Sequence, residues 1–178
     1  MFKIEEACLV VIDIQGKLAN IVEESEKMID NTTKLVQAMN ALNVPIIWIE
    51  QNPTRLGSTT EQIAQYMKGQ PIRKMTFNGC LDKEVLDAIK ASGRKQFILT
   101  GIETHICVYQ TGRSLKEQGY EVEIVVDAVA SRTKANKEIG LTKMQALNIL
   151  PTSTEMIIYE LLQTGEHDQF KTLLKLIK

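Results

Sequence analysis

Short apolar segments rich in β-branched residues alternate along this chain with longer segments of helical periodicity. The apolar segments that we expect to be strands cover residues 7–13, 44–50, 71–77, 95–101, 121–128 and 155–160. Helical patterns cover residues 24–42, 81–93, 105–119, 134–147 and 168–178. Apolar strands separated by helices form parallel sheets that are covered on both faces. Because crossover connections are right-handed, we predict a doubly wound α/β fold, a three-layer α/β/α sandwich.

Composition limits the class of protein further. Residues 1–178 contain no linker, repeat or low-complexity tract, so we expect a single domain with a substantial core. The formal net charge is -1, without a long run of either sign, so neither nucleic acid nor a membrane surface is an expected partner. The apolar runs are far too short to span a bilayer.

Three scattered cysteines and two histidines restrict the possible metal and redox chemistry. No CxxC pair is present, so we expect neither a disulfide framework nor a cysteine zinc site. A metal site built on several histidines is equally unexpected, and no cofactor is predicted. The N-terminus is acidic where a signal peptide would be basic, and we therefore expect a reduced, cytoplasmic location.

Candidate functional residues follow the expected strands, because doubly wound sheets bind ligands beyond the carboxyl ends of their strands. Asp13 ends the first apolar segment, where a carboxylate needs a partner or caps the next helix; both interpretations stay open. With Thr104 as N-cap, Cys107 would lie in a first helical turn, where the helix dipole favours a thiolate. The alternative for Cys107 is a small buried hydrophobe.

Lys74 lies in an apolar-flanked segment, where a cation close to an aspartate and a cysteine would stabilise a thiolate. An isolated lysine is more often a solvated surface group. Cys8 is interpreted as a core residue of the first strand, and Cys80 has no identifiable base. His105 stands two residues before Cys107, and residues two apart on a helix do not face each other, so it is not expected to be a catalytic base.

Four segments resemble the isochorismatase-like cysteine hydrolases, namely "VVIDIQGKL", "RKMTFNGC", "GIETHICVYQT" and "VVDAVASR". Two more, "WIEQNPTRLGSTTEQI" and "TSTEMIIYELL", are similar to the isochorismatase domain-containing proteins. The resemblance extends over nearly the whole chain. It implies a six-stranded parallel sheet in the order 3-2-1-4-5-6 and a homo-oligomer.

The resemblance also implies roles for particular residues. Asp13, Lys74 and Cys107 match the family's catalytic triad. A cis peptide bond is implied at Ile102–Glu103, with the N–H groups of Glu103 and Cys107 forming an oxyanion hole.

Two departures from related families narrow the expected chemistry. Nicotinamidases carry an Asp/His metal cluster after the second strand, whereas "EQNPTRLGS" here has no histidine, so no metal is expected. Isochorismatases that act on a vinyl ether commonly lack the cysteine, so its presence favours acyl chemistry through a Cys107 thioester. The expected substrate is a small molecule, an amide or related acyl compound, in a pocket lined by Gln51, Phe77 and Ile102.

Three alternatives remain. The first is a vinyl-ether hydrolase that uses Asp13 without covalent catalysis. The second is a catalytically silent binding or scaffold protein with the same fold. A dinucleotide-binding domain ranks last, because no GxGxxG follows the first strand.

Overall fold

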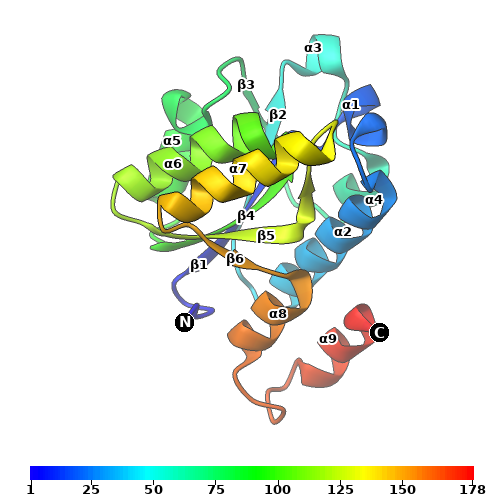
Figure 1. Cartoon of the computed structure of the whole chain (residues 1–178). Coiled ribbons are helices and arrows are strands. Elements are labelled where there is room, and N and C mark those ends of the chain that lie inside the picture. Colours follow the sequence, from blue (N-terminus) through cyan, green and yellow to red (C-terminus); the bar gives the residue numbers. More distant parts are fainter.

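A single six-stranded sheet forms the middle of the molecule in this computed structural model, which describes residues 1–178 (Figure 1). All neighbouring strands are parallel, and their order is β3-β2-β1-β4-β5-β6. The predicted doubly wound fold and the strand order implied by the resemblance are therefore confirmed. The strands are β1 (Ala7–Ile12), β2 (Ile46–Gln51), β3 (Ile72–Lys74), β4 (Gln96–Ile102), β5 (Glu121–Ala130) and β6 (Leu150–Thr152).

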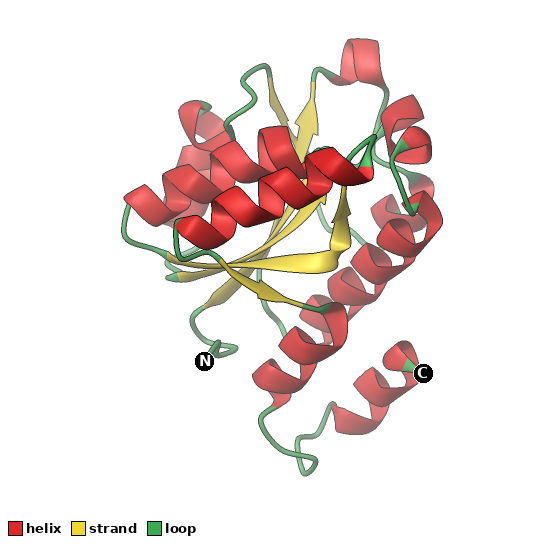
Figure 2. Cartoon of the chain, in the orientation of Figure 1, coloured by secondary structure: helices red, strands yellow, loops and turns green.

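Helices cover both faces of the sheet, which makes three layers (Figure 2). The α-helices are α1 (Gly16–Ile21), α2 (Ser25–Ala41), α3 (Pro53–Leu56), α4 (Glu61–Ala64), α5 (Lys83–Ala91), α6 (Tyr109–Glu117), α7 (Lys134–Ala146), α8 (Thr154–Leu162) and α9 (Phe170–Ile177). One core joins the sheet to α1, α2, α4, α8 and α9, and a second joins its other face to α5, α6 and α7. No helix combines the length and apolar character that a membrane crossing requires.

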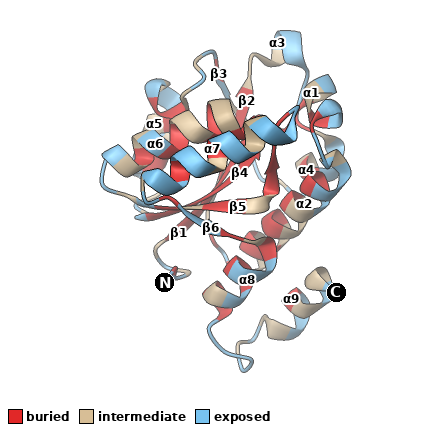
Figure 3. Cartoon of the chain, viewed as in Figure 1, coloured by how far each residue is buried: buried red, intermediate tan, exposed pale blue.

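Strand β1 explains why the apolar segments are continuous rather than alternating. Leu9 and Val11 belong to one core, whereas Val10 and Ile12 belong to the other, so every side chain of the strand is buried (Figure 3). Continuous apolar runs are what a strand needs when both of its faces are covered.

The prediction of a strand at residues 155–160 is wrong. This segment lies within helix α8, and the last strand is the shorter Leu150–Thr152. The Ser153 hydroxyl accepts a hydrogen bond from the Met156 N–H at 3.2 Å and so caps α8. Buried Ile157, Ile158, Leu161 and Leu162 repeat at helical spacing, which a short apolar run does not distinguish from a strand. The short helices α1, α3 and α4 were not predicted.

Strands β1 and β4 approach closely at the point where the strand order reverses. Gly101 pairs with Ile12, and a Cβ atom at position 101 would lie 2.1 Å from the Ile12 carbonyl oxygen. The φ angle of Gly101 is +135°, a conformation that side chains rarely adopt. A glycine at this position therefore lets the carboxyl ends of the two central strands lie side by side.

Candidate active site

Asp13 directly follows β1 and is almost fully buried, with 3% of its surface exposed. Its φ angle is 56°, in the left-handed region that aspartate tolerates better than most residues. Its N–H donates to the Ile49 carbonyl oxygen at 3.1 Å, which holds it against β2. The residue at the N-cap of α1 is Gln15, so Asp13 is not a helix cap.

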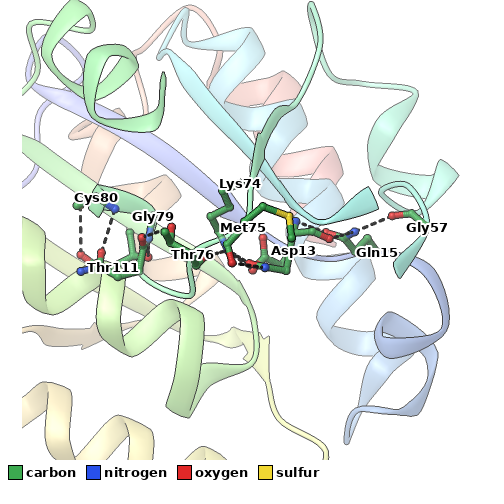
Figure 4. A network of polar contacts seen from close by, with 11 residues as sticks. Asp13, Gln15, Gly57, Lys74, Met75, Thr76, Gly79, Cys80 and Thr111 are labelled. Atoms are coloured by element: carbon green, nitrogen blue, oxygen red, sulfur yellow. Dashed lines mark hydrogen bonds and ion pairs between the residues drawn. The ribbon is translucent and has the colours of Figure 1, made fainter. Parts of the chain in front are cut away.

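Lys74 ends β3, and its ammonium group points at Asp13 (Figure 4). The Nζ atom donates to Asp13 Oδ2 at 2.8 Å, to Gln51 Oε1 at 2.6 Å and to the Thr76 carbonyl oxygen at 3.0 Å. An ammonium group has three donors, so all three are used. With 1% of its surface exposed, Lys74 is not a solvated surface lysine.

Gln15 is a positioning residue that the sequence analysis did not identify. Its Oε1 accepts from the Gln51 N–H at 2.7 Å, while its Nε2 donates to the carbonyl oxygens of Gln51 at 2.9 Å and Gly57 at 2.6 Å. The side chain thus joins the end of β1 to the end of β2 and to the segment after α3. The only sequence signal was its position two residues after Asp13, in "VVIDIQGKL".

Cys107 lies in a π-helical turn, Thr104–Val108, between β4 and α6. The prediction that Thr104 caps this helix is wrong, because Thr104 is the first residue of the turn and its buried hydroxyl has no hydrogen-bond partner. Glu103 occupies the capping position without a side-chain cap. Single π-helical turns inside helices occur frequently at functional sites.

Burial raises the pKa of the Cys107 thiol to about 12, and the adjacent Asp13 charge acts in the same direction. Lys74 opposes both effects. Burial likewise raises the pKa of Asp13, against the pull of Lys74. Asp13 Oδ1 has no partner of hydrogen-bond geometry, although the Cys107 thiol is near enough for the two groups to shift each other's pKa. The resting Cys107 side chain is therefore a neutral thiol beside Asp13, and not the thiolate that the helix-dipole argument favoured.

The peptide bond Ile102–Glu103 is cis, as the resemblance implied. The Glu103 carboxylate is occupied by Arg132, whose backbone N–H donates at 3.0 Å and whose Nε donates at 3.1 Å. The Glu103 backbone N–H makes no hydrogen bond within the chain, which leaves it available to a ligand.

A cavity of about 110 Å³ opens beside these residues. Its lining consists of Asp13, Gln15, Leu18, Gln51, Leu56, Phe77, Ile102, Glu103, Ile106 and Cys107. The three residues expected in the pocket are thus on its wall, and Lys74 lies behind Asp13 and Gln51. Leu56 and Phe77 are 40% and 59% exposed and form the rim. A larger hollow of about 460 Å³ lies at the opposite end of β2, around Val44 and Pro45, away from Cys107.

The remaining candidates have structural partners. Cys8 lies inside β1, and the Cys80 thiol donates to the Thr111 carbonyl oxygen at 3.8 Å. The His105 ring forms a hydrogen bond of 3.0 Å with the Ser131 hydroxyl.

No group of three or more His, Cys, Asp or Glu side chains is arranged to hold a metal ion. Glu50, near the end of β2, instead accepts hydrogen bonds from the Thr59 N–H at 2.7 Å and the Thr59 hydroxyl at 2.8 Å.

Known proteins resemble this chain along almost its whole length. Residues 7–156 match the family model described as Isochorismatase domain. Isochorismatase family protein 1B of Dictyostelium discoideum is 33% identical, over 98% of this chain and 87% of that protein. Isochorismatase domain-containing protein 2 of Danio rerio is also 33% identical, over 95% and 85%. A solved structure named MAR1 ribonuclease, from Caenorhabditis elegans, has a TM-score of 0.94 and 32% identity, over 99% of this chain and 91% of that one.

Proposed function

The chain belongs to the isochorismatase family, and within that family we propose that it is a cysteine hydrolase acting on a small amide or related acyl compound. The observation that supports this proposal most directly is the buried ion pair of Lys74 and Asp13 next to the Cys107 thiol, at the wall of an open cavity. A nucleophile, a base and a residue that orients the base are the parts that nucleophilic catalysis requires.

In the first half of the reaction, Asp13 takes the thiol proton as Cys107 Sγ attacks the acyl carbon. The carbonyl π electrons move to the oxygen, which the N–H groups of Glu103 and Cys107 stabilise as an oxyanion. One such donor supplies about 3–4 kcal/mol in other acyl-transfer enzymes. When the oxyanion collapses, the carbon–nitrogen bond breaks and Asp13 returns its proton to the departing amine.

In the second half, water attacks the Cys107 thioester, and Asp13 takes the proton of that water. The carbon–sulfur bond breaks, the carboxylic acid leaves and the proton returns to the thiol. Lys74 keeps Asp13 oriented in both halves through its hydrogen bond of 2.8 Å. Its positive charge offsets the free-energy cost of burying two anionic groups.

The high thiol pKa fits this sequence of steps. A thiol with a pKa of about 12 stays protonated at neutral pH, so its deprotonation has to accompany attack on the substrate. Asp13 is the neighbouring group that can accept the proton, because its Oδ1 has no other partner.

Ammonia release from a panel of small amides tests the proposal, with purified wild-type protein and with Cys107→Ala. We expect turnover of at least one amide, a mass increase at Cys107 equal to the amide minus ammonia, and loss of both in the variant. Cys80→Ala is the matched control and should keep activity. Ammonia release that persists in Cys107→Ala without an adduct would refute the Cys107 thioester. Turnover of a vinyl ether, and of no amide, would favour the alternative in which Asp13 acts without covalent catalysis.

Complete inactivity on every amide, ester and vinyl ether would favour the silent scaffold. The C. elegans relative is named a ribonuclease, so RNA belongs in the substrate panel as well. We further propose a homo-oligomer, as the family resemblance implies, and light scattering on the purified protein tests it.

A further inference from the structure

The walls of the active-site cavity point to the class of substrate. We propose that the cavity selects acyl compounds whose remainder is small, apolar and uncharged, and that it excludes those bearing a carboxylate. This inference rests on the proposed hydrolase function, and it concerns the part of the substrate that does not react.

The first argument is the sign of the charges on the cavity wall. The ionisable groups of the lining are two carboxylates, Asp13 and Glu103, and the Cys107 thiol. No lysine, arginine or histidine belongs to the lining. An anionic substrate would therefore find no free cation to replace its hydration in a partly desolvated site, which costs binding free energy.

The nearest cations do not change this conclusion. Lys74 is buried behind Asp13, and all three of its N–H donors are bound within the chain. Arg132 pairs with Glu103 through both its backbone N–H and its Nε, and its side chain is 56% exposed outside the lining. Neither cation is placed to accept a substrate carboxylate.

The second argument is that the polar side chains of the wall are already occupied. Gln15 uses its oxygen and both protons of its amide on the backbone of Gln51 and Gly57. The Gln51 amide accepts from Lys74 and donates to the Met75 carbonyl oxygen at 2.9 Å. What remains for a ligand is the second N–H of the Gln51 amide and, at the reacting centre, Asp13 Oδ1, the cysteine and the unpaired Glu103 N–H.

The third argument is the shape and chemistry of the remaining surface. Leu18, Leu56, Phe77, Ile102 and Ile106 form the rest of the wall. The cavity of about 110 Å³ is well below the roughly 300–1,000 Å³ of pockets for drug-sized ligands. Hydrocarbon walls around a small space favour a short alkyl or alkenyl group and leave a charged end without solvation.

Alkylation of Cys107 tests this charge preference without requiring turnover. Iodoacetamide and iodoacetate have the same shape, but only the second is anionic. At Cys107, the rate constant for iodoacetamide is divided by that for iodoacetate, with both reactions monitored by peptide mass mapping. The same ratio for 2-mercaptoethanol in the same buffer is the reference. We expect the ratio at Cys107 to exceed the reference by about tenfold or more. A ratio no larger than the reference would overturn the proposal.

A charge introduced at the rim provides the matched variant. Leu56→Arg places a cation beside the cavity, at a position 40% exposed and outside the hydrogen-bonded network. The variant should lower the iodoacetamide preference severalfold, whereas Leu56→Gln, which is polar but neutral, should leave it near the wild-type value. An equal effect of both substitutions would show that polarity or access, and not charge, governs the preference.

Two substrates of equal size separate this inference from the proposed function. In succinamate a carboxylate replaces the isopropyl group of 4-methylpentanamide. We expect kcat/KM to favour 4-methylpentanamide by about a hundredfold or more. Cys107-dependent turnover that favours succinamate would refute the substrate class and leave the hydrolase standing. Turnover retained in Cys107→Ala would refute the hydrolase mechanism, and the alkylation ratio would still decide the charge preference.

Discussion

Lys74 Nζ lies 2.8 Å from Asp13 Oδ2, and the exposed fractions of the two side chains are 0% and 4%. Breaking a buried pair leaves an uncompensated charge inside the protein, which costs about 3–5 kcal/mol in other proteins. The pair is therefore both the polar centre of the site and a structural contact between the ends of β1 and β3.

Substitutions of Lys74 and of Asp13 should shift the pKa of the Cys107 thiol in opposite directions. Lys74→Ala removes the cation that lowers the thiol pKa, so this pKa should rise, and alkylation at mildly alkaline pH should slow by about tenfold or more. Asp13→Asn removes an anion that raises the thiol pKa, so alkylation should become faster although amide turnover falls by orders of magnitude. The measurement is alkylation rate against pH. An unchanged Lys74→Ala curve would remove the lysine from the proposed mechanism.

Cys107 should be the first of the three cysteines to react with limiting iodoacetamide. Burial raises the pKa of all three thiols, to about 12 for Cys8 and Cys107 and to about 11 for Cys80. Access therefore decides the order, and Cys107 is the only one of the three that lines the cavity. Peptide mapping after brief labelling measures it. Faster labelling of Cys80 would mean that its slightly lower pKa outweighs the cavity.

Activity should survive exhaustive chelation. The structure contains no cluster of three or more metal-binding side chains. The Glu50 carboxylate accepts hydrogen bonds from the Thr59 N–H and hydroxyl. Structural and catalytic zinc sites need at least three protein ligands. Turnover of the best amide before and after treatment with EDTA is the measurement. Loss of activity that added zinc restores would contradict this prediction.

Glu123 should make the protein less stable as the pH rises from about 4.5 to about 7. Burial, followed by the nearby charge of Glu160, raises its pKa to about 7, with Glu121 adding to the effect and the Met1 amine opposing it. The folded state thus holds this proton more tightly than the unfolded chain, whose glutamate titrates near 4.5. Stability from this group is complete at low pH and is lost between these two pKa values.

The variant Glu123→Gln keeps the protonated shape at every pH. Its melting temperature should match the wild type at about pH 5 and exceed it at about pH 8. Thermal unfolding at both pH values measures this difference. A gain of equal size at both would show that the substitution acts through packing and not through the proton.

Gly101→Ala should be among the most destabilising small substitutions in the chain. The new Cβ atom would lie 2.1 Å from the Ile12 carbonyl oxygen, so β1 and β4 would have to separate, at a cost of about 3 kcal/mol or more. Gly93→Ala is the matched control, because Gly93 also has a positive φ but no atom lies within 4 Å of its Cβ position. It should cost only about 1–2 kcal/mol in urea unfolding. Similar losses of stability for both variants would mean that contact with the Ile12 carbonyl oxygen is not what destabilises Gly101→Ala.

The fold class could be predicted from the sequence because its signal is distributed along the chain. Several apolar segments rich in β-branched residues, such as residues 7–13, alternate with helical patterns, and this alternation favours a parallel sheet covered on both faces. The last strand was misplaced for the converse reason. Residues 155–160 are a short apolar run, and helical spacing and strand burial are indistinguishable over such a length.

The sequence was sufficient to select candidate residues for the site, but it did not predict the protonation state of the Cys107 thiol. Asp13 and Cys107 could be selected because each follows an apolar segment. The thiolate expectation failed because it weighed the helix terminus alone, whereas burial and the Asp13 charge together raise the thiol pKa. Gln15 was missed because its partners are backbone groups near Gln51 and Gly57, and such contacts leave no pattern of residue types.

The separation between the polar network and the cavity rim has an evolutionary consequence. Leu56 and Phe77 lie at the rim and are not members of the hydrogen-bonded chain that runs from Lys74 through Gln51 to Gln15. Mutations at the rim can therefore accumulate while the reactive groups keep their positions. Descendants of such a chain could acquire new substrates by changing two or three side chains, with the chemical step inherited intact.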